Sequence, residues 1–190
     1  MRAVLLALLL VLSGAASSFA QEADPGQFVP DLGSLYMEAD AGDAGAQYDL
    51  GFYYETGIGV PQDDAEAAKW YRMAAEQGHA RAEERLGSMY AAGRGVDMDE
   101  AEAGKWLERA AGHGDVDAQV KMGIRNEQGF GVAVDRVQAL MWYEIAADNG
   151  DSDAVEWRDA LAAGMAADDA AQARTLAKAW REAHPPAKPE

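Results

Sequence analysis

Residues 44–78 read AGAQYDLGFYYETGIGVPQDDAEAAKWYRMAAEQG, and this stretch decides the fold because it occurs in three successive copies. Its Leu50-Gly51 pair returns as Leu86-Gly87, 36 residues later, and as Met122-Gly123 after the same interval. The G-x-G-V element, the tryptophan, the Ala-Ala pair and the closing glycine follow the same period, so the copies align without a gap. Repetition at this period predicts a solenoid of stacked helical units and argues against a globular enzyme with a single pocket.

Within each copy the sequence predicts two helices separated by a glycine turn. Leu50 and Tyr54 lie one helical turn apart on the apolar face of the first helix. We expect this helix to end at Gly57, because glycine adopts the left-handed conformation of a helix end without steric cost. Asp63 precedes Glu66 by three residues, a capping-box-like pair that recurs in the other copies and marks the start of the second helix.

The second helix of each copy combines large rings with small residues on its apolar face. In the first copy Ala67, Trp70, Tyr71 and Ala74 fall at positions i, i+3, i+4 and i+7. The next copy begins directly after the closing glycine, and connections this short favour antiparallel neighbours. Each copy is therefore predicted to be an α-hairpin, and the fold class to be all-α.

The first twenty residues have the features of a cleavable signal peptide. Arg2 supplies a positive charge, an apolar run extends from Ala3 to Leu12, and Ser18 and Ala20 are small residues that a signal peptidase accepts. The run is too short for a membrane span, which needs about 20 apolar residues. We expect cleavage after Ala20, which would give a periplasmic or secreted protein without an integral membrane segment.

The segments that flank the repeats are predicted to cap the stack. Ala39 falls one period before Ala75, so the residues ahead of the first repeat look like the second helix of a degenerate half-repeat. After the third repeat, Arg158-Asp159 replaces the Leu-Gly pair. The expected division is 1–20 signal peptide, 21–43 N-terminal segment and capping half-repeat, 44–78, 79–114 and 115–150 repeats, 151–183 capping helices, and 184–190 disordered Pro-rich tail.

Charge and cysteine content narrow the choice of partners. Of the 16 basic residues Arg2 leaves with the signal peptide, so 15 basic residues face 33 acidic ones, a net charge of −18. A field of this sign repels phosphate backbones, and nucleic acid is therefore not expected as a partner. The chain has no cysteine, which excludes disulfides and thiolate metal sites.

The sequence contains no evident catalytic or metal-binding motif. The G-x-G elements follow a helix rather than a strand and occur three times, so they are turns and not nucleotide-binding loops. The three histidines lack ligand spacing and are expected to be solvated, and the serines lack a nucleophile motif. Asp148, Asp151 and Asp153 crowd one turn without the spacing of a calcium loop, which favours helix capping and leaves calcium as the alternative. No cofactor is expected.

The pattern A-x-A-x-x-x-L-G-x-x-Y, then G-x-G-V-x-x-D, then A-x-x-W-x-x-x-A-A-x-x-G resembles the Sel1-like repeat, a relative of the tetratricopeptide repeat. The resemblance covers about residues 44–150, with Asn126 in place of the tyrosine in the third copy. It implies a right-handed α-solenoid superhelix of antiparallel helix pairs, with three full repeats plus terminal caps. It also implies an interaction scaffold or adaptor, since some similar bacterial proteins regulate signalling proteins at the inner membrane. A cysteine-rich branch is linked to β-lactam binding or hydrolysis, but this chain lacks its paired cysteines.

Differences among the copies single out a stripe on the first helices. It reads Tyr48, Phe52 and Glu55 in the first copy, Glu84, Ser88 and Ala91 in the second, and Val120, Ile124 and Glu127 in the third. The resemblance to tetratricopeptide folds places this stripe on the concave face, a habitual binding surface. Its apolar side chains would contact a protein or peptide, and its glutamates would favour basic residues on that partner. Alternatively, these side chains are merely exposed or pack between repeats.

The sequence thus predicts an exported scaffold that binds a protein or peptide and catalyses nothing, and the most concrete form of this prediction is a periplasmic regulator of a signalling protein. One alternative is a cell-wall-related or β-lactam-binding hydrolase of the Sel1-like type, which only distant relatives support. Another is an acidic protein that buffers metal ions. The oligomeric state stays open.

Overall fold

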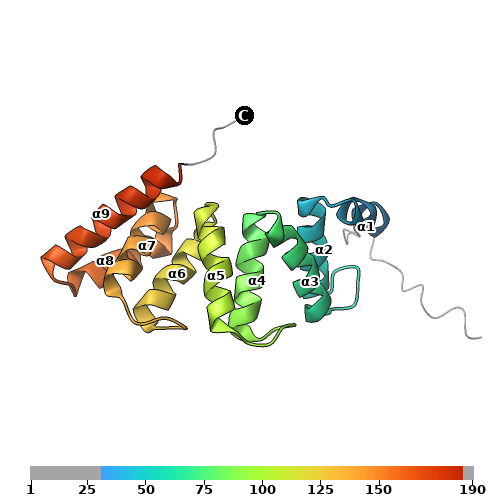
Figure 1. Ribbon diagram of the computed structural model, residues 1–190, viewed down its shortest axis with the longest axis horizontal. Coiled ribbons are helices and arrows are strands. Elements are labelled where there is room, and N and C mark those ends of the chain that lie inside the picture. The colour runs from blue at the N-terminus through green and yellow to red at the C-terminus, as the bar shows by residue number, and fades with distance from the viewer. Residues whose placement is uncertain (1–30, 186–190) are drawn as a thin grey trace, which may run out of the picture. The chain divides into compact units, whose positions relative to one another are not determined.

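The computed structural model describes residues 31–185, which form nine α-helices and no strand (Figure 1). The helices are α1 (Leu32–Asp40), α2 (Ala44–Thr56), α3 (Asp64–Glu76), α4 (Ala80–Ala92), α5 (Glu100–Gly112), α6 (Val116–Gln128), α7 (Arg136–Asp148), α8 (Ser152–Ala163) and α9 (Ala167–Ala183). None of these described helices is long and apolar enough to cross a membrane. The predicted signal peptide, residues 21–30 of the predicted N-terminal segment and residues 186–190 of the predicted tail lie outside the described residues.

Helices α2 to α7 form three antiparallel pairs, one for each copy of the sequence (Figure 1). Each second helix also packs on the first helix of the next pair, so that α3 contacts α4 and α5 contacts α6. Buried side chains, mostly of alanine, leucine and tyrosine, form the core within and between the pairs. The prediction of an all-α solenoid is confirmed.

The helices of the repeats end and begin where the sequence indicates. Gly57 follows α2 with a φ of 74°, in the left-handed region. The Asp63 carboxylate then accepts hydrogen bonds from the amides of Ala65 and Glu66 at 2.9 and 3.0 Å. The reciprocal half of a capping box does not form, because the Asp63 amide donates to the Tyr54 carbonyl at 2.9 Å. This bond ties the start of the second helix to the first helix, and the other two repeats contain its equivalent.

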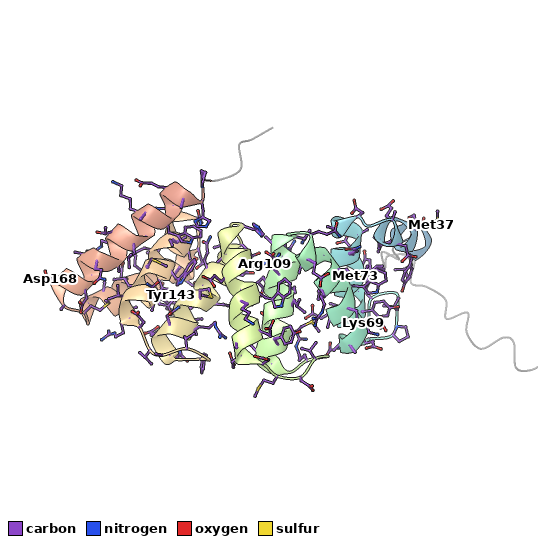
Figure 2. All side chains as sticks on the ribbon, viewed as in Figure 1. Met37, Lys69, Met73, Arg109, Tyr143 and Asp168 are labelled. Carbon is purple, nitrogen blue, oxygen red and sulfur yellow. The ribbon has the colours of Figure 1, made fainter. Side chains whose placement is uncertain are left out.

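The glycine of the Leu-Gly pair lets the two helices of a hairpin approach closely. Tyr71 on α3 covers Gly51 on α2 so tightly that a Cβ atom on the glycine would lie 2.5 Å from the ring. Tyr143, labelled in Figure 2, covers Gly123 with a corresponding distance of 2.4 Å. Carbon atoms in contact normally lie about 3.5–4.0 Å apart. The repeated glycine is therefore required for packing.

The C-terminal helices close the stack without forming a fourth hairpin. Helix α8 packs on α7 as the first helix of a repeat would, but α9 also packs on α7 instead of pairing with α8 (Figure 1). Asp159 occupies the position of the repeat glycine, so its side chain stands where the ring of a second helix would have to pack. Ala170, Ala173 and Ala177 are buried and bring α9 close to α7.

Helix α1 covers the other end of the stack by packing on α2. Ala39 is fully buried, and its carbonyl accepts a hydrogen bond from Gln47 Nε2 at 3.0 Å. Tyr36 packs edge-on against Trp70, and its hydroxyl lies 2.6 Å from that of Tyr54. The pKa of Tyr36 is raised to about 12, mainly by burial and to a smaller extent by this hydrogen bond. These contacts give α1 the place of a second helix ahead of the first repeat.

Candidate functional site

The predicted stripe lies on α2, α4 and α6, and its first residue is a packing residue. Tyr48 is only 7% exposed and leans on Tyr71, with ring centroids 5.6 Å apart. It also stacks on His79 at 4.8 Å, and the guanidinium of Arg81 lies 5.2 Å from its ring centroid. Because His79 and Arg81 belong to the second repeat, Tyr48 joins two repeats. The alternative that stripe residues pack between repeats holds at this position.

Glu55, the third residue of the stripe, is held by three neighbours. Its carboxylate accepts hydrogen bonds from the Tyr71 hydroxyl and from Arg94 Nη2, both at 2.7 Å, and Arg85 lies 4.0 Å away. Burial acts to raise the pKa of Glu55, but the hydrogen bonds from Arg94 and Tyr71 and the positive charge of Arg85 outweigh burial and lower it. Glu55 is therefore a buried anion that links the first and second repeats.

Glu84 and Ser88 form a second polar connection, between the second and third repeats. The Glu84 carboxylate is buried and pairs with Lys121 of α6. The Ser88 hydroxyl donates to Glu84 at 2.8 Å and accepts a hydrogen bond from Lys121 Nζ at 2.8 Å. Arg85 lies 3.7 Å from the other oxygen of Glu84. Both stripe residues are thus engaged within the chain.

Three partly exposed cations lie over the buried carboxylates of Glu55 and Glu84. Arg85, Arg94 and Lys121 have side chains 38–42% exposed, while the carboxylates of Glu55 and Glu84 beneath them are 6–9% exposed. The three cations meet these two buried carboxylates and that of Asp64, which lies 4.0 Å from Arg94, in a chain whose net charge is −17. Of the carboxylates expected to attract basic partner residues, those of Glu55 and Glu84 are thus paired with cations of the chain itself.

The remaining residues of the stripe are partly buried. Glu127 accepts a hydrogen bond from the Tyr143 hydroxyl at 2.8 Å, as Glu55 does from Tyr71. Phe52 packs against the core of the first two repeats, and Ile124 packs against the cluster beneath the C-terminal cap. Val120 is half-buried.

A cavity of about 200 Å³ opens on this face between the second and third repeats. Its apolar walls are Ala91, Leu107, Ile124 and Phe130. Its polar residues are Ser88, Glu100, Lys121 and Arg125. Ser88, Ala91 and Ile124 were singled out from the sequence, whereas the cavity itself and its other five residues were not.

A difference between the second repeat and the other two explains the cavity. In the first and third repeats a tyrosine of the second helix donates to a glutamate of the first, as Tyr71 does to Glu55. The second repeat has Leu107 and Ala91 at these two positions. The ring and the carboxylate are lost together, so the space they would fill stays open and neither member of the pair remains without the other. This paired substitution is the signal that a comparison of single positions missed.

The histidines, expected to be solvated turn residues, each have a structural partner. His113 Nδ1 lies 2.7 Å from a carboxylate oxygen of Glu83, which is fully buried on α4. His79 accepts a hydrogen bond from a backbone amide and caps the start of α4. His184, at the start of the predicted tail, stacks on Trp180 with ring centroids 4.3 Å apart. Their roles within residues 31–185 are therefore in packing and capping.

Two of the aspartates around Gly150 form a helix cap and an ion pair within the chain. Asp151 accepts a hydrogen bond from the Ala154 amide at 2.7 Å and caps α8, as the capping interpretation proposed. Asp148 pairs with Arg181 of α9. Within the described residues, no three side chains of histidine, aspartate or glutamate are grouped so that they could hold a metal ion.

Stacked helix pairs with a 36-residue period define an α-solenoid repeat protein of the tetratricopeptide-like class. The family model of the Sel1 repeat matches residues 44–79, 80–115 and 116–151. The chain belongs to the family of Sel1 repeat proteins.

Solved structures agree with this assignment. A Sel1 repeat protein from Oxalobacter formigenes is 49% identical, with a TM-score of 0.63 over 68% of this chain and 97% of that one. The protein c5321, a protective antigen of uropathogenic Escherichia coli strains with an SLR fold, is 32% identical, with a TM-score of 0.75 over 80% of this chain and 33% of that one. Cysteine rich protein B of Helicobacter pylori, at 21% identity and a TM-score of 0.53 over 65% of this chain and 94% of that one, shares the fold. No curated protein matches the sequence significantly.

Proposed function

We propose that this protein is a non-catalytic scaffold that binds a protein or peptide through the face formed by α2, α4 and α6. Sel1 repeat proteins are typically protein-interaction scaffolds, which supports the general role. The observation that supports this face in particular is the cavity of about 200 Å³ between the second and third repeats. A packed scaffold needs no such opening, whereas a binding surface uses one to hold a side chain of its partner.

Site-specific photocrosslinking tests the choice of face. A photoreactive amino acid placed at position 52, 88 or 124 should capture a partner in the native host. The same group at Met73 on α3 or Gln172 on α9, both exposed, should not. Capture from the control positions alone, or from none of the five, would remove this face as the binding surface. Circular dichroism of each variant checks that the helices are retained.

We also propose that the protein is exported and acts in the periplasm or outside the cell, as an adaptor or as a regulator of a membrane signalling protein. The support is the signal-peptide pattern of residues 1–20. Fractionation of the native host followed by N-terminal sequencing tests it, and the mature chain should begin at Gln21. A cytoplasmic protein that retains Arg2 would contradict export.

A cell-wall-related or β-lactam hydrolase is the second candidate, with one observation in its favour. Ser88 Oγ lies 2.8 Å from Lys121 Nζ, as a nucleophile and its base can. However, Lys121 Nζ is the donor and Ser88 Oγ the acceptor of this contact, whereas a general base would have to accept the proton of the hydroxyl. We therefore expect no sustained nitrocefin turnover. Turnover that disappears in Ser88→Ala would favour the hydrolase instead.

A further inference from the structure

The cavity between the second and third repeats is continuous with an exposed apolar loop. Phe130 lines the cavity and is itself 47% exposed. The same loop exposes Val132 by 44% and Val134 by 61%. The valines equivalent to Val132 in the first two repeats are partly buried. Single exposed apolar residues are common on protein surfaces, whereas several that lie together mark an interaction site. The apolar loop beside the cavity belongs to the second kind.

The size of the cavity suits one side chain. A cavity of about 150 Å³ lined by apolar residues accepts a benzene molecule, and this one has about 200 Å³. Its walls are formed by Ala91, Leu107, Ile124 and Phe130, which offer no hydrogen bond from their side chains. An aliphatic or aromatic side chain is therefore the matching occupant, since a polar one would lose its hydrogen bonds to water.

The polar side of the cavity favours a negative group beside that side chain. Lys121 lines the cavity with 40% of its side chain exposed, while the carboxylate that neutralises it, Glu84, is 6% exposed. Arg125 also lines the cavity, but it is buried and paired at 2.5 Å with Glu100 of the same lining, so Lys121 is the cation open to a partner. Because 40% of the Lys121 side chain stays exposed, its ammonium can receive a carboxylate of a partner from the solvent side in addition to Glu84.

We propose that this cavity binds an aliphatic or aromatic side chain of a partner polypeptide that carries a carboxylate next to it, with the carboxylate placed at Lys121. This inference rests on the proposed function and specifies the chemistry of the partner at that face. The loop of Phe130, Val132 and Val134 extends the apolar contact beyond the cavity.

The paired substitution supplies a variant that closes the cavity with the protein's own contacts. In Ala91→Glu/Leu107→Tyr, the second repeat regains the hydrogen-bonded pair of its neighbours. Gly87 already stands beneath position 107, as Gly51 stands beneath Tyr71, so the new ring has room to pack. We expect a melting temperature equal to or above that of the wild type. Leu107→Phe is a second cavity-filling variant, which needs no hydrogen bond.

Fluorescence anisotropy with labelled heptapeptides measures binding to the cavity. The probes have a central Asp-Leu-Asp, Asp-Ala-Asp or Lys-Leu-Lys sequence in otherwise identical glycine-rich chains. The wild type should bind Asp-Leu-Asp at least about tenfold more tightly than Asp-Ala-Asp, as expected for a difference of several carbon atoms in an apolar pocket. It should also bind Asp-Leu-Asp more tightly than Lys-Leu-Lys. Both cavity-filling variants should lose this binding.

Ala92→Glu, which adds a charge at the exposed neighbouring position, is the matched control and should bind as the wild type does. Unchanged binding in a folded cavity-filling variant would overturn the inference, and so would tighter binding of Lys-Leu-Lys. Equal loss in Ala92→Glu, or no binding of Asp-Leu-Asp by the wild type, would overturn it as well. If photocrosslinking from positions 52, 88 and 124 still succeeded in such a case, the proposed function would stand and only the cavity chemistry would fail.

Discussion

At the scale of single residues, Glu55 shows why differences among repeats are ambiguous. Glu55 has a counterpart in Glu127, where the second helix also supplies a tyrosine, and it is replaced by Ala91 where that tyrosine is Leu107. Glu84 likewise matches Lys121 of the next repeat. A position can therefore differ among copies because its intramolecular partner differs. Comparison of single positions does not separate contacts between repeats from a surface open to a partner, whereas comparison of pairs of positions can.

The lowered pKa of Glu55 gives a prediction about acid stability. A carboxylate whose pKa is lower in the folded state stabilises the protein at pH values above its unfolded pKa, about 4.3. This stabilisation is lost as the pH falls through the folded pKa. The difference in unfolding free energy between wild type and Glu55→Gln should thus be constant near neutral pH and shrink below about pH 4. Urea unfolding between pH 3 and 7 measures it. Glu76→Gln, at an exposed position, is the control, and an identical pH dependence in both variants would contradict the account.

Glu83 supports a second prediction at this scale. Its buried carboxylate contacts His113, and Arg109 (Figure 2) lies 2.9 Å from Oε1 while its hydrogen bond goes to the Ala75 carbonyl. The third repeat has a neutral pair at the equivalent positions, with Asn149 donating to Gln119 at 2.8 Å. We therefore expect Glu83→Gln/His113→Asn to keep the wild-type stability within about 1 kcal/mol, since a neutral pair can replace a buried ionic one.

The contrasting variant Arg109→Ala/His113→Ala leaves the Glu83 carboxylate buried and without either partner. It should lose about 3–5 kcal/mol, the usual cost of an uncompensated buried charge. Chemical unfolding of both double variants decides between the two outcomes. Equal losses would mean that the charges of this cluster are not what holds α4 and α5 of the second repeat together.

At the scale of helices, the sequence predicted the boundaries well and the contacts between helices less well. Gly57 and Asp63 are local signals, because the left-handed turn and the capping bonds involve only residues near them in the chain. The amide of Asp63 was expected to serve a capping box, but it bonds to the first helix of the hairpin. That bond depends on how two helices pack, which local sequence patterns do not determine.

The role of the repeat glycine leads to a prediction for the hairpin. Gly51→Ala would place a Cβ atom 2.5 Å from the Tyr71 ring, and the helices would have to move apart. Overpacking of this kind costs about 1–3 kcal/mol, more than the gain from replacing glycine within a helix. Gly112→Ala is the matched control, because its nearest neighbour is 3.9 Å from the added atom. Thermal unfolding should show destabilisation by the first change and little effect or a small gain from the second.

At the scale of the whole molecule, the period of the repeat predicted the solenoid, because each hairpin can bury its apolar face only against the next. The loss of the Leu-Gly pair at Arg158-Asp159 also marked the end of the array. What the pattern did not predict is that α9 leaves α8 and packs on α7. Helix α9 could pack either on α8 or on α7, and the surfaces of these two helices decide between them. Asp159 hinders packing on α8, and the apolar surface of α7 is still uncovered.

The cap formed by α9 is therefore expected to hold the third repeat in place. Trp142 of α7 is 5% exposed and packs edge-on against Trp180 of α9, with centroids 5.4 Å apart. A chain that ends at Gly164 would expose Trp142 together with the fully buried Leu140 and Ile145. Removing one large aromatic contact from a core costs about 3–5 kcal/mol, so the melting temperature should fall sharply. The exposed apolar face should also promote self-association.

Circular dichroism melting and light scattering after gel filtration measure the two effects of this truncation. A chain that ends at Pro185 keeps α9 and is the matched control.

The order in which the helices unfold is a further test, because each repeat of a solenoid is stabilised mainly by its nearest neighbours. Hydrogen exchange should increase first in α6 and α7 of the truncated chain and only later in α2 and α3. A uniform increase across all repeats would mean that the stack unfolds as one unit, and an unchanged melting temperature would mean that α9 contributes nothing to its stability.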